Sequence, residues 1–470
     1  MRLLTAAALA AGALMLGTTA VAGDDLVKVS GTSPFPAACS EAGPGTLHLN
    51  SEVQPHLAVN PRNPMHLVAA YQQDRWSSIA SQGVVAASSF DGGRTWKRAV
   101  PATSECSGGG NLKRATDSWV AVAPDSTAYL ATLAMTKAFF EPGSEHVIQV
   151  SRSGDGGLNW GPATVLARDG GLTVFNDLPA VTADPFDSRY VYLVWTRIEV
   201  LSDTDFTGTT QMSRSTDGGR TWEQPKVIHD PGRNNQTIAN KIVVRPDGTL
   251  VNAYTRYYPA PDGSYQHEVA VIRSADKGRT WSAPSKVADL TKTGVRDPET
   301  GTPIRDGSSF VQLAASGRDV YVAWQDSRFS SGTQDGIVLS RSGDGGVSWS
   351  APVQVAANAF APALAVRRDG VVGVSFYDLR DNTSDPATLP ANLRLATSRD
   401  GVRWNEQRVA SFDYAGAPTV DRPVKSLYLG DYHGLVASGS AFVPLFPMAG
   451  KDPANSSDVY TARVQPKAGL

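Results

Sequence analysis

The stretch that decides the fold is Ser89-Phe90-Asp91-Gly92-Gly93-Arg94-Thr95-Trp96, which has the form S-x-D-x-G-x-T-W. The same form returns further along the chain, with Asn159 and Ser348 in place of the threonine in two copies, at Ser153–Trp160, Ser215–Trp222, Ser274–Trp281 and Ser342–Trp349. A sixth copy, Ser398–Trp404, is one residue shorter. A motif that recurs at a near-constant spacing indicates a chain built from similar structural units.

Each copy predicts a hairpin turn that is held together by its own aspartate. An apolar strand precedes the copies, as Val269–Ile272 precedes the fourth. An aspartate in such a turn accepts hydrogen bonds from nearby backbone N–H groups, and the glycines permit positive φ angles. One active site does not need six near-identical aspartates. We therefore interpret all six as structural residues: Asp91, Asp155, Asp217, Asp276, Asp344 and Asp400.

The motif lies inside a larger unit of four antiparallel strands, which is the size of a propeller blade. Successive motif aspartates are 64, 62, 59, 68 and 56 residues apart. A seventh unit at the C-terminus lacks the motif and a fourth strand. Residues 26–30 offer that strand by pairing with residues 459–464, which closes the ring and removes both sheet edges. The sequence therefore predicts an all-β propeller with seven blades favoured and six as the alternative.

The N-terminal residues are typical of a secretory signal peptide. Arg2 precedes an apolar run, and Ala20-Val21-Ala22 is a small-x-small cleavage site. We expect residues 1–22 to be removed, leaving a secreted, extracellular chain whose residues 23–470 form one propeller domain. In that compartment Cys39 and Cys106 can form a disulfide, and the alternative is two separate buried thiols.

Composition limits the classes of partner. A formal net charge of −2 gives no bulk attraction toward nucleic acid, and no stretch after the signal is long and apolar enough to span a membrane. The sequence has no zinc-binding spacing and no phosphate loop, so we expect no metal and no cofactor. The alternative is calcium at one of two oxygen-rich stretches, Arg380–Asp385 or Asp452–Asp458, although neither has the spacing of a known calcium loop. We also expect a monomer. His56 and His433 each begin a first strand. Either they reach the mouth of the propeller or they are solvated loop residues, and we favour the second interpretation.

The repeated motif resembles that of the Asp-box, or BNR-repeat, proteins of the sialidase-like superfamily. For a sialidase, the resemblance implies three arginines that grip a carboxylate, an acid aspartate, and a tyrosine nucleophile activated by a glutamate. At the position of the first arginine this chain has Val53. Asp74 is the carboxylate of the loop that would hold the acid, and Gly430-Asp431-Tyr432-His433 is similar to the tyrosine motif.

The loops opposite the motif turns form the usual binding face of a propeller, and acidic and arginine residues repeat in them. Loops after second strands supply the predicted catalytic residues Asp74 and Glu199 and the predicted substrate-binding residues Arg75, Arg197, Arg256, Tyr257, Arg328 and Arg380. Loops before first strands bring Glu52, Asp117, Asp177, Arg305, Asp306, Asp431 and the predicted nucleophile Tyr432. Arginine suits carboxylates, sulfates and phosphates. The alternative is that these charges form ion pairs between blades and contact no ligand.

Three functions agree with this pattern. The first is a secreted glycoside hydrolase, exo-sialidase-like, or another enzyme that processes acidic saccharides. The second is a non-catalytic propeller that binds a glycan or a protein. The third is a structural or assembly role without a small ligand. An acid–base pair with shifted pKa values at the mouth of the propeller would distinguish the first from the other two.

Overall fold

The computed structural model describes residues 26–36, 39, 43–138, 141–421 and 423–466. The predicted signal peptide and the predicted start at Gly23 lie outside these residues. In the described part of the chain the helical elements are three short 3-10 turns, η2 (Glu105–Ser107), η3 (Arg328–Ser330) and η4 (Tyr414–Gly416). No helix there is long and apolar enough to cross a membrane.

In the described residues, strand pairing gives three four-stranded sheets around the ring and two eight-stranded sheets. Each eight-stranded sheet divides into two four-stranded groups joined by a single bridge, and we call every four-stranded group a blade. The first four blades are β2–β5 (Leu47–Val59, Leu67–Trp76, Ser81–Ser89, Lys97–Ala99), β6–β9 (Arg114–Val122, Ala128–Met135, Glu145–Ser153, Thr164–Gly170), β10–β13 (Val174–Ala183, Val191–Val200, Phe206–Ser215, Lys226–His229) and β14–β17 (Gln236–Val244, Leu250–Pro259, Tyr265–Ser274, Ser285–Leu290). The other three are β20–β23 (Gln312–Ser316, Asp319–Asp326, Gly336–Ser342, Val353–Ala356), β24–β27 (Ala359–Val366, Val372–Asp378, Pro390–Ser398, Asn405–Asp413) and β30–β32 (Gly434–Ser438, Ala441–Asp452, Asn455–Thr461) with β1 (Val27–Lys28).

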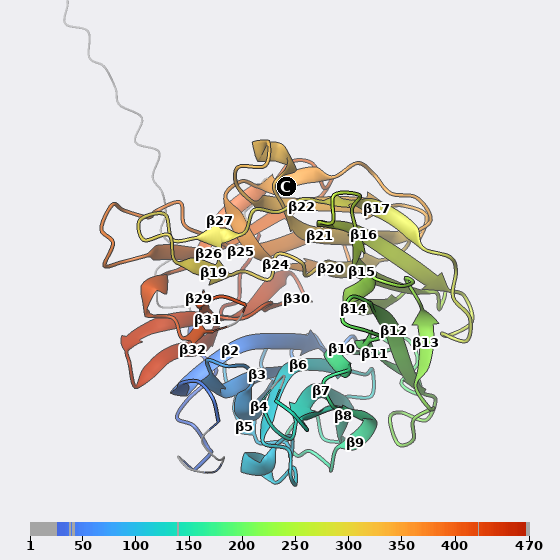
Figure 1. Ribbon diagram of the computed structural model, residues 1–470. Helices are drawn as coiled ribbons and strands as arrows, with labels where there is room; N and C mark the ends of the chain where they lie inside the picture. Colours follow the sequence, from blue (N-terminus) through green and yellow to red (C-terminus); the bar gives the residue numbers. More distant parts are fainter. Residues whose placement is uncertain (1–25, 37–38, 40–42, 139–140, 422, 467–470) are drawn as a thin grey trace, which may run out of the picture.

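The first strands of the blades surround one central axis (Figure 1). They are β2, β6, β10, β14, β20, β24 and β30; each contacts the first strand of the next blade, and β30 contacts β2. This closed ring confirms the predicted all-β propeller class.

The two ends of the described chain meet in the last blade. Val27 pairs with Thr461, and Lys28 pairs with Tyr460. The Lys28 ammonium also lies 2.7 Å from the Asp458 carboxylate. The strand β1 therefore completes the sheet that β30, β31 and β32 begin.

The S-x-D-x-G-x-T-W turns show how each motif aspartate holds its own loop. In the first copy, Asp91 Oδ1 accepts hydrogen bonds from the backbone N–H groups of Arg94 and Thr95, each at 2.9 Å. In the second copy, Asn159 replaces the threonine and donates from its side chain to Asp155 at 2.7 Å. Hydrogen bonds from the side chain and backbone of Asn159 lower the pKa of Asp155 to about 2.

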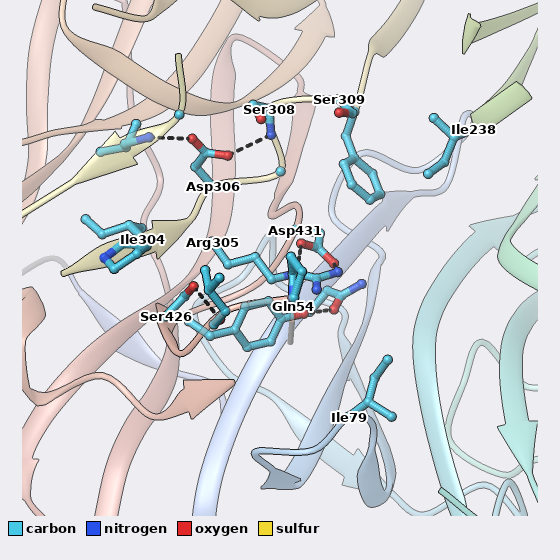
Figure 2. A pocket seen from close by; sticks show the side chains of 18 of the residues that line it. Gln54, Ile79, Ile238, Ile304, Arg305, Asp306, Ser308, Ser309, Ser426 and Asp431 are labelled. Atoms are coloured by element: carbon cyan, nitrogen blue, oxygen red, sulfur yellow. Dashed lines mark hydrogen bonds and ion pairs between the residues drawn. The ribbon is translucent and has the colours of Figure 1, made fainter. Parts of the chain in front are cut away.

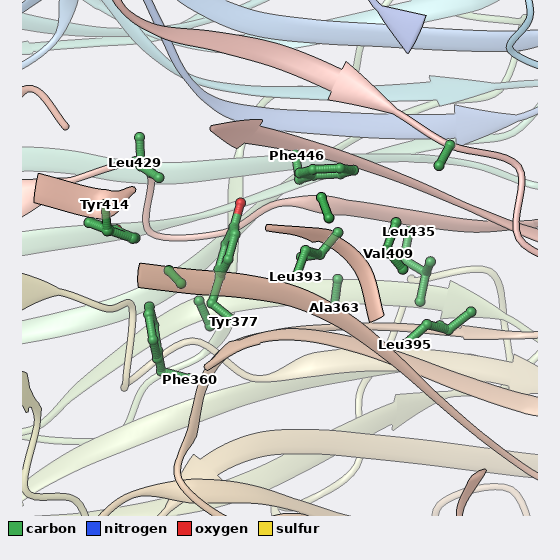
Figure 3. Close-up of a cluster of buried hydrophobic side chains, with 14 of the residues drawn as sticks. Phe360, Ala363, Tyr377, Leu393, Leu395, Val409, Tyr414, Leu429, Leu435 and Phe446 are labelled. Atoms are coloured by element: carbon green, nitrogen blue, oxygen red, sulfur yellow. The ribbon is translucent and has the colours of Figure 1, made fainter. Parts of the chain in front are cut away.

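Buried apolar side chains join neighbouring blades. Figure 3 shows the cluster between the blade of β24–β27 and the closing blade, with Phe360, Tyr377, Leu393 and Phe446. The Tyr377 hydroxyl donates to the Pro447 carbonyl at 2.9 Å, so its polar atom is satisfied within the cluster. This packing ties the closing blade to its predecessor.

A small extra sheet lies beside the ring and is made from two long connections. Its strands are β18 (Val295–Arg296), β19 (Pro303–Arg305), β28 (Thr419–Val420) and β29 (Ser426–Tyr428). Strands β19 and β29 pair in parallel, with Ile304 opposite Leu427 and Arg305 opposite Tyr428. The sheet therefore joins the connection before β20 to the connection before β30; we call it the rim sheet.

The predicted disulfide between Cys39 and Cys106 is present, with the two Cα atoms 5.2 Å apart. It links the segment after β1 to η2, which follows the blade of β2–β5. The two residues are 67 positions apart, so the bond closes a long loop of the unfolded chain.

We expect the double substitution Cys39→Ser and Cys106→Ser to lower the free energy of unfolding by about 4 kcal/mol, because the unfolded chain gains the entropy of a loop of this length. Denaturant unfolding measures the change, and wild-type protein in reductant is the matched control. A loss below ~1 kcal/mol in the double variant would contradict the expectation.

Candidate functional site

A pocket of about 820 Å³ opens where the first strands begin. Its lining comes from the first strands β2, β6, β10 and β14, from the later parts of the second strands β3, β7 and β15 with residues 78–79, from residues 292–310, and from residues 423–431. Figure 2 shows Gln54, Arg305 and Asp431 close together in this pocket, with Ser308 and Ser309 above them. The rim sheet supplies one wall, so the pocket combines segments that are far apart in the sequence.

Repeated bulges shape the mouth of the propeller. The pairing of first and second strands shifts register in five blades, and each shift contains a non-glycine residue with positive φ, namely Gln54 (53°), Asp117 (51°), Leu178 (52°), Ala239 (57°) and Ala361 (49°). Such a backbone conformation costs about 1 kcal/mol or more per residue and is usually kept for a functional or geometric reason. Here the bulges bring Gln54, Asp117 and Leu178 to the pocket lining.

An ion pair between an arginine and a carboxylate lies in the pocket lining. Arg305 donates from Nε to Asp431 Oδ1 at 2.7 Å and from Nη2 to Asp431 Oδ2 at 2.8 Å. This bidentate geometry fixes the plane of the guanidinium. Because Arg305 belongs to the rim sheet and Asp431 to the segment before β30, the pair also holds the two connections together.

A second arginine, Arg75, lies deeper and is only 2% exposed. It donates to Gln72 Oε1 at 2.7 Å, Gln72 donates to Gln54 Oε1 at 2.8 Å, and Gln54 donates to Asp117 Oδ1 at 2.8 Å. The Tyr428 hydroxyl also donates to Gln54 Oε1. This chain of hydrogen bonds connects the buried cation to a carboxyl group of the pocket floor.

Tyr428 lies between the two arginines. The guanidinium carbon of Arg75 is 4.7 Å from the centre of the Tyr428 ring, and that of Arg305 is 5.7 Å from it. Both distances allow a cation–π attraction. Burial raises the pKa of Tyr428 far above its usual value, so its hydroxyl stays protonated at neutral pH.

Two carboxyl groups of the floor have raised pKa values. Burial and, next, the charge of Asp431 raise the pKa of Asp117 to about 6. Burial and, next, the charge of Asp117 raise the pKa of Asp177 to about 8. At neutral pH Asp177 is therefore mostly protonated while Asp117 is mostly ionised, which is the arrangement of a general acid beside a general base.

The charge of the lining favours an anion. Four carboxyl groups and four cations line the pocket: Asp117, Asp177, Asp306 and Asp431 against Arg75, Lys292, Arg296 and Arg305. Burial also raises the pKa of Asp306. Because Asp177 carries a proton at neutral pH, the cations outnumber the ionised carboxylates. Among the described residues, no three His, Cys, Asp or Glu side chains are grouped as a metal site would require.

Two of the nine residues predicted as catalytic or substrate-binding line this pocket. Arg75 is at its floor, and Tyr257 is at its edge, where the hydroxyl of Tyr257 and the ammonium of Lys292 both donate to Ser309 Oγ. The Lys292 ammonium is 5.7 Å from the Tyr257 ring centre.

Two of the predicted catalytic residues are buried away from the pocket. Asp74 is fully buried and accepts hydrogen bonds from the Ser33 hydroxyl at 2.5 Å and from the Asn50 N–H at 2.8 Å. Tyr432 is buried under the pocket floor, and its hydroxyl donates to the Ser118 carbonyl at 3.0 Å. Neither of them is a lining residue of the pocket.

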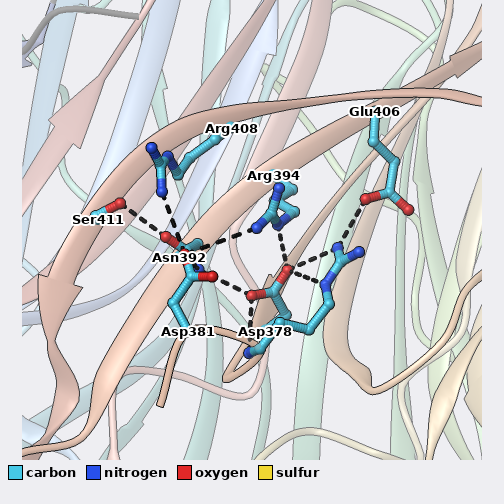
Figure 4. Close-up of polar contacts among 8 residues, drawn as sticks. Asp378, Asp381, Asn392, Arg394, Glu406, Arg408 and Ser411 are labelled. Carbon is cyan, nitrogen blue, oxygen red and sulfur yellow. Dashed lines mark hydrogen bonds and ion pairs between the residues drawn. The ribbon is translucent and has the colours of Figure 1, made fainter. Parts of the chain in front are cut away.

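The other predicted residues form ion pairs, most of them within one blade, and also lie outside the pocket lining. Arg380 pairs with Asp378 and Glu406 at 2.7 Å each, and Figure 4 shows these two carboxylates in their charged network. The remaining pairs are Arg197 with Asp169 and Glu199, Arg256 with Glu268, and Arg328 with Asp326. This is the charge-pairing alternative: Arg197 and Asp169 join two neighbouring blades, and the partners in the other pairs belong to the same blade.

Asp117, Asp177, Arg305 and Asp431 were expected near the mouth from their place before first strands, and they line the pocket. None of the four was among the residues predicted to be catalytic or substrate-binding. Sequence reasoning missed Gln54 and Tyr428 entirely as pocket residues. The signal available for Tyr428 was its position three residues before Asp431, which placed it in the same connection.

We expect Asp177→Asn to change how stability depends on pH. An ordinary aspartate pKa near 3.8 rises to about 8 in the fold, so the folded state binds more protons than the unfolded state in this interval. Stability of the wild type should therefore fall as pH rises from about 4 to about 8. The variant should lose the part of this fall that belongs to Asp177, while the part from Asp117 remains, and should exceed the wild type by about 1–3 kcal/mol at pH 8, the usual scale for an unfavourably buried polar group.

Denaturant unfolding at pH 4, 6 and 8 measures the effect, and Glu199→Gln, which removes a carboxylate outside the pocket, is the control. Parallel pH profiles for Asp177→Asn and the wild type would contradict the expected protonation of Asp177.

Comparison with known proteins finds a family model that matches the middle of the chain. A BNR repeat-like domain matches residues 207–415. A sialidase of Bacteroides fragilis (strain YCH46) is 24% identical over 223 residues, which are 42% of this chain and 37% of that protein. The match thus spans little more than a third of the relative.

Solved structures with a similar overall arrangement are more distant. Hadza microbial sialidase Hz136 has 15% identity and a TM-score of 0.48, covering 87% of this chain and 76% of that one. The α-L-arabinofuranosidase Arb93A of Fusarium graminearum has 11% identity and a TM-score of 0.47, covering 94% and 97%. The repeated turns and the closed ring of strands agree with the domain match, so residues 207–415 of this chain are similar to a BNR repeat-like domain.

Proposed function

We propose that the protein is a secreted glycoside hydrolase that cleaves an acidic saccharide in the mouth pocket. The observation that carries this proposal is the pair Asp117 and Asp177, whose pKa values differ while both line the same pocket. Secretion is proposed from the N-terminal signal sequence, and the Cys39–Cys106 disulfide supports it.

Hydrolysis of a glycosidic bond needs one proton delivered and one removed. Protonated Asp177 would give its proton to the leaving oxygen as the bond to the anomeric carbon breaks. Ionised Asp117 would take a proton from the attacking water, and Gln54 would hold the Asp117 carboxylate in place through its 2.8 Å hydrogen bond. One water is consumed, and the pair regains its starting state when a proton returns from Asp117 to Asp177.

The cations of the pocket would select the substrate. Arg75 and Arg305 lie on either side of Tyr428, and Lys292 and Arg296 line the same pocket. Asp431 neutralises only Arg305. The remaining positive charge supports a saccharide with a carboxylate or sulfate, and the sialidase match of the sequence agrees with this class.

The second candidate function is a propeller that binds a glycan without cleaving it. The observation that favours it is that Arg197, Arg256, Arg328 and Arg380 already have carboxylate partners. A binding protein needs the pocket and its cations but not the proton transfer between Asp117 and Asp177.

We expect Asp177→Asn to reduce kcat/KM by about 10²–10⁴-fold, the usual contribution of a general acid, on a fluorogenic panel of α-sialosides, uronides and sulfated sugars. The matched control is Glu199→Gln, which we expect to stay within about twofold of the wild type. Equal turnover by Asp177→Asn and wild type would refute the assigned acid, and no turnover by folded wild type would favour the binding function.

The pH dependence of kcat/KM should be bell-shaped, with limbs near pH 6 and pH 8, because activity needs Asp117 ionised and Asp177 protonated. The two groups interact, so the limbs belong to the pair. Replacing Asp117 with asparagine should remove the acidic limb together with most of the activity. A profile that is flat between pH 5 and pH 9 would be the contrary result.

A further inference from the structure

A second cavity of about 170 Å³ lies on the propeller axis below the mouth pocket. Each of the seven first strands contributes to its lining, and the polar lining residues are His56, Thr182, Lys241, Gln312 and His433. A narrow space lies between this cavity and the mouth pocket. Asp117, Leu178 and Phe310 line both the narrow space and the mouth pocket. Trp119 and Lys241 line both the narrow space and the axial cavity.

Lys241 places a buried ammonium group at this cavity, and the residue is only 7% exposed. Its Nζ donates to the Val311 carbonyl at 2.7 Å and to Gln312 Oε1 at 3.0 Å, and it lies 4.8 Å from the centre of the Trp119 ring. All three partners are neutral. Among the described residues no carboxylate lies within ion-pair distance of this ammonium, and the cavity lining contains no Asp or Glu.

A buried cation without a counterion is costly, because it loses its hydration and gains no opposite charge. Burial accordingly lowers the pKa of Lys241 to about 7. An anion in the adjoining cavity would supply the missing charge and keep the ammonium protonated.

Two neutral histidines offer further hydrogen-bonding groups to such an anion. His56 Nδ1 accepts a hydrogen bond from the Val120 N–H at 3.2 Å, so the ring proton is on Nε2, which is a donor. His433 Nε2 shares a 2.7 Å hydrogen bond with the Ser375 hydroxyl, and within the described residues its Nδ1 is buried without a partner. Burial lowers the pKa of both imidazoles, so they act as neutral groups near pH 7.

We propose that this axial cavity is a binding site for one small inorganic anion of about the size of chloride, held by Lys241 with His56 and His433. The volume accommodates such an ion with a few waters, since a water occupies about 30 Å³ in the liquid. The positive charge of Lys241 disfavours a cation in this space. The site is independent of the hydrolase proposed for the mouth pocket.

Two measurements on the whole protein test the site. Crystals grown in bromide should show anomalous density in the axial cavity within hydrogen-bonding reach of Lys241 Nζ. In thermal unfolding at constant ionic strength, replacing gluconate with chloride should raise the midpoint by about 1–2 °C for each tenfold increase above the dissociation constant.

The variant Lys241→Met should lose the chloride dependence, whereas Lys292→Met, which removes a cation of the mouth pocket, should keep it. Lys241→Gln serves as a second variant if methionine prevents folding, and the bromide experiment needs no variant. Absence of density in the cavity, or equal chloride dependence in wild type and Lys241 variants, would overturn the proposal. Loss of the chloride dependence only in Lys292→Met would do so as well, because the anion would then bind at the mouth.

Discussion

Closure of the ring of first strands is the constraint on which the rest of the structure depends. Pairing of β1 with β32 and the contact of β30 with β2 leave no free edge between the first and last blades. An open end would present unpaired backbone groups and invite association with another chain. Once the ring is closed, one side of every first strand faces the same axis, so residues from seven distant segments share one narrow space.

Along that axis the structure creates two electrostatic environments. At the mouth, bulged strand starts and the rim sheet bring carboxyl groups and arginines together, and mutual repulsion with burial keeps Asp177 protonated. Further in, Lys241 and the histidines lie without any acidic neighbour in the cavity lining. The aromatic and apolar residues between the two spaces, including Trp119, Tyr432 and Phe310, separate them. We infer one saccharide site and one small-anion site from this division.

Features that depend on local sequence could be predicted, and features that depend on non-local pairing could not. The motif turns, the propeller class and the disulfide follow from short patterns and repeat spacing. The predicted arginines failed to reach the pocket for a local reason: in Asp378-Leu379-Arg380 and Asp326-Ser327-Arg328 the arginine folds back on the aspartate two positions before it. Arg256 lies directly opposite Glu268 on the next strand, which provides its partner.

Whether a predicted residue reaches the pocket also depends on contacts that the local sequence does not reveal. Asp74 and Arg75 are adjacent on β3, but Asp74 hydrogen-bonds to Ser33 and Asn50, and only Arg75 lines the pocket. Tyr428 lies in the pocket because the rim sheet pairs its strand with β19, a contact across more than a hundred residues that no local pattern reveals. His56 and His433 were interpreted as solvated loop residues, which is wrong, because both line the axial cavity and His433 is buried.

The central claim is that the mouth pocket contains a protonated aspartate at neutral pH beside an ionised one. The most direct test is an NMR titration of ¹³C-labelled aspartate carboxyl groups in the wild type, with Asp177→Asn and Asp117→Asn to assign the signals. The account predicts one carboxyl that titrates near pH 8, absent from Asp177→Asn, and one near pH 6 whose midpoint falls when Asp177 is replaced. Titration of every aspartate carboxyl below about pH 5 would contradict it.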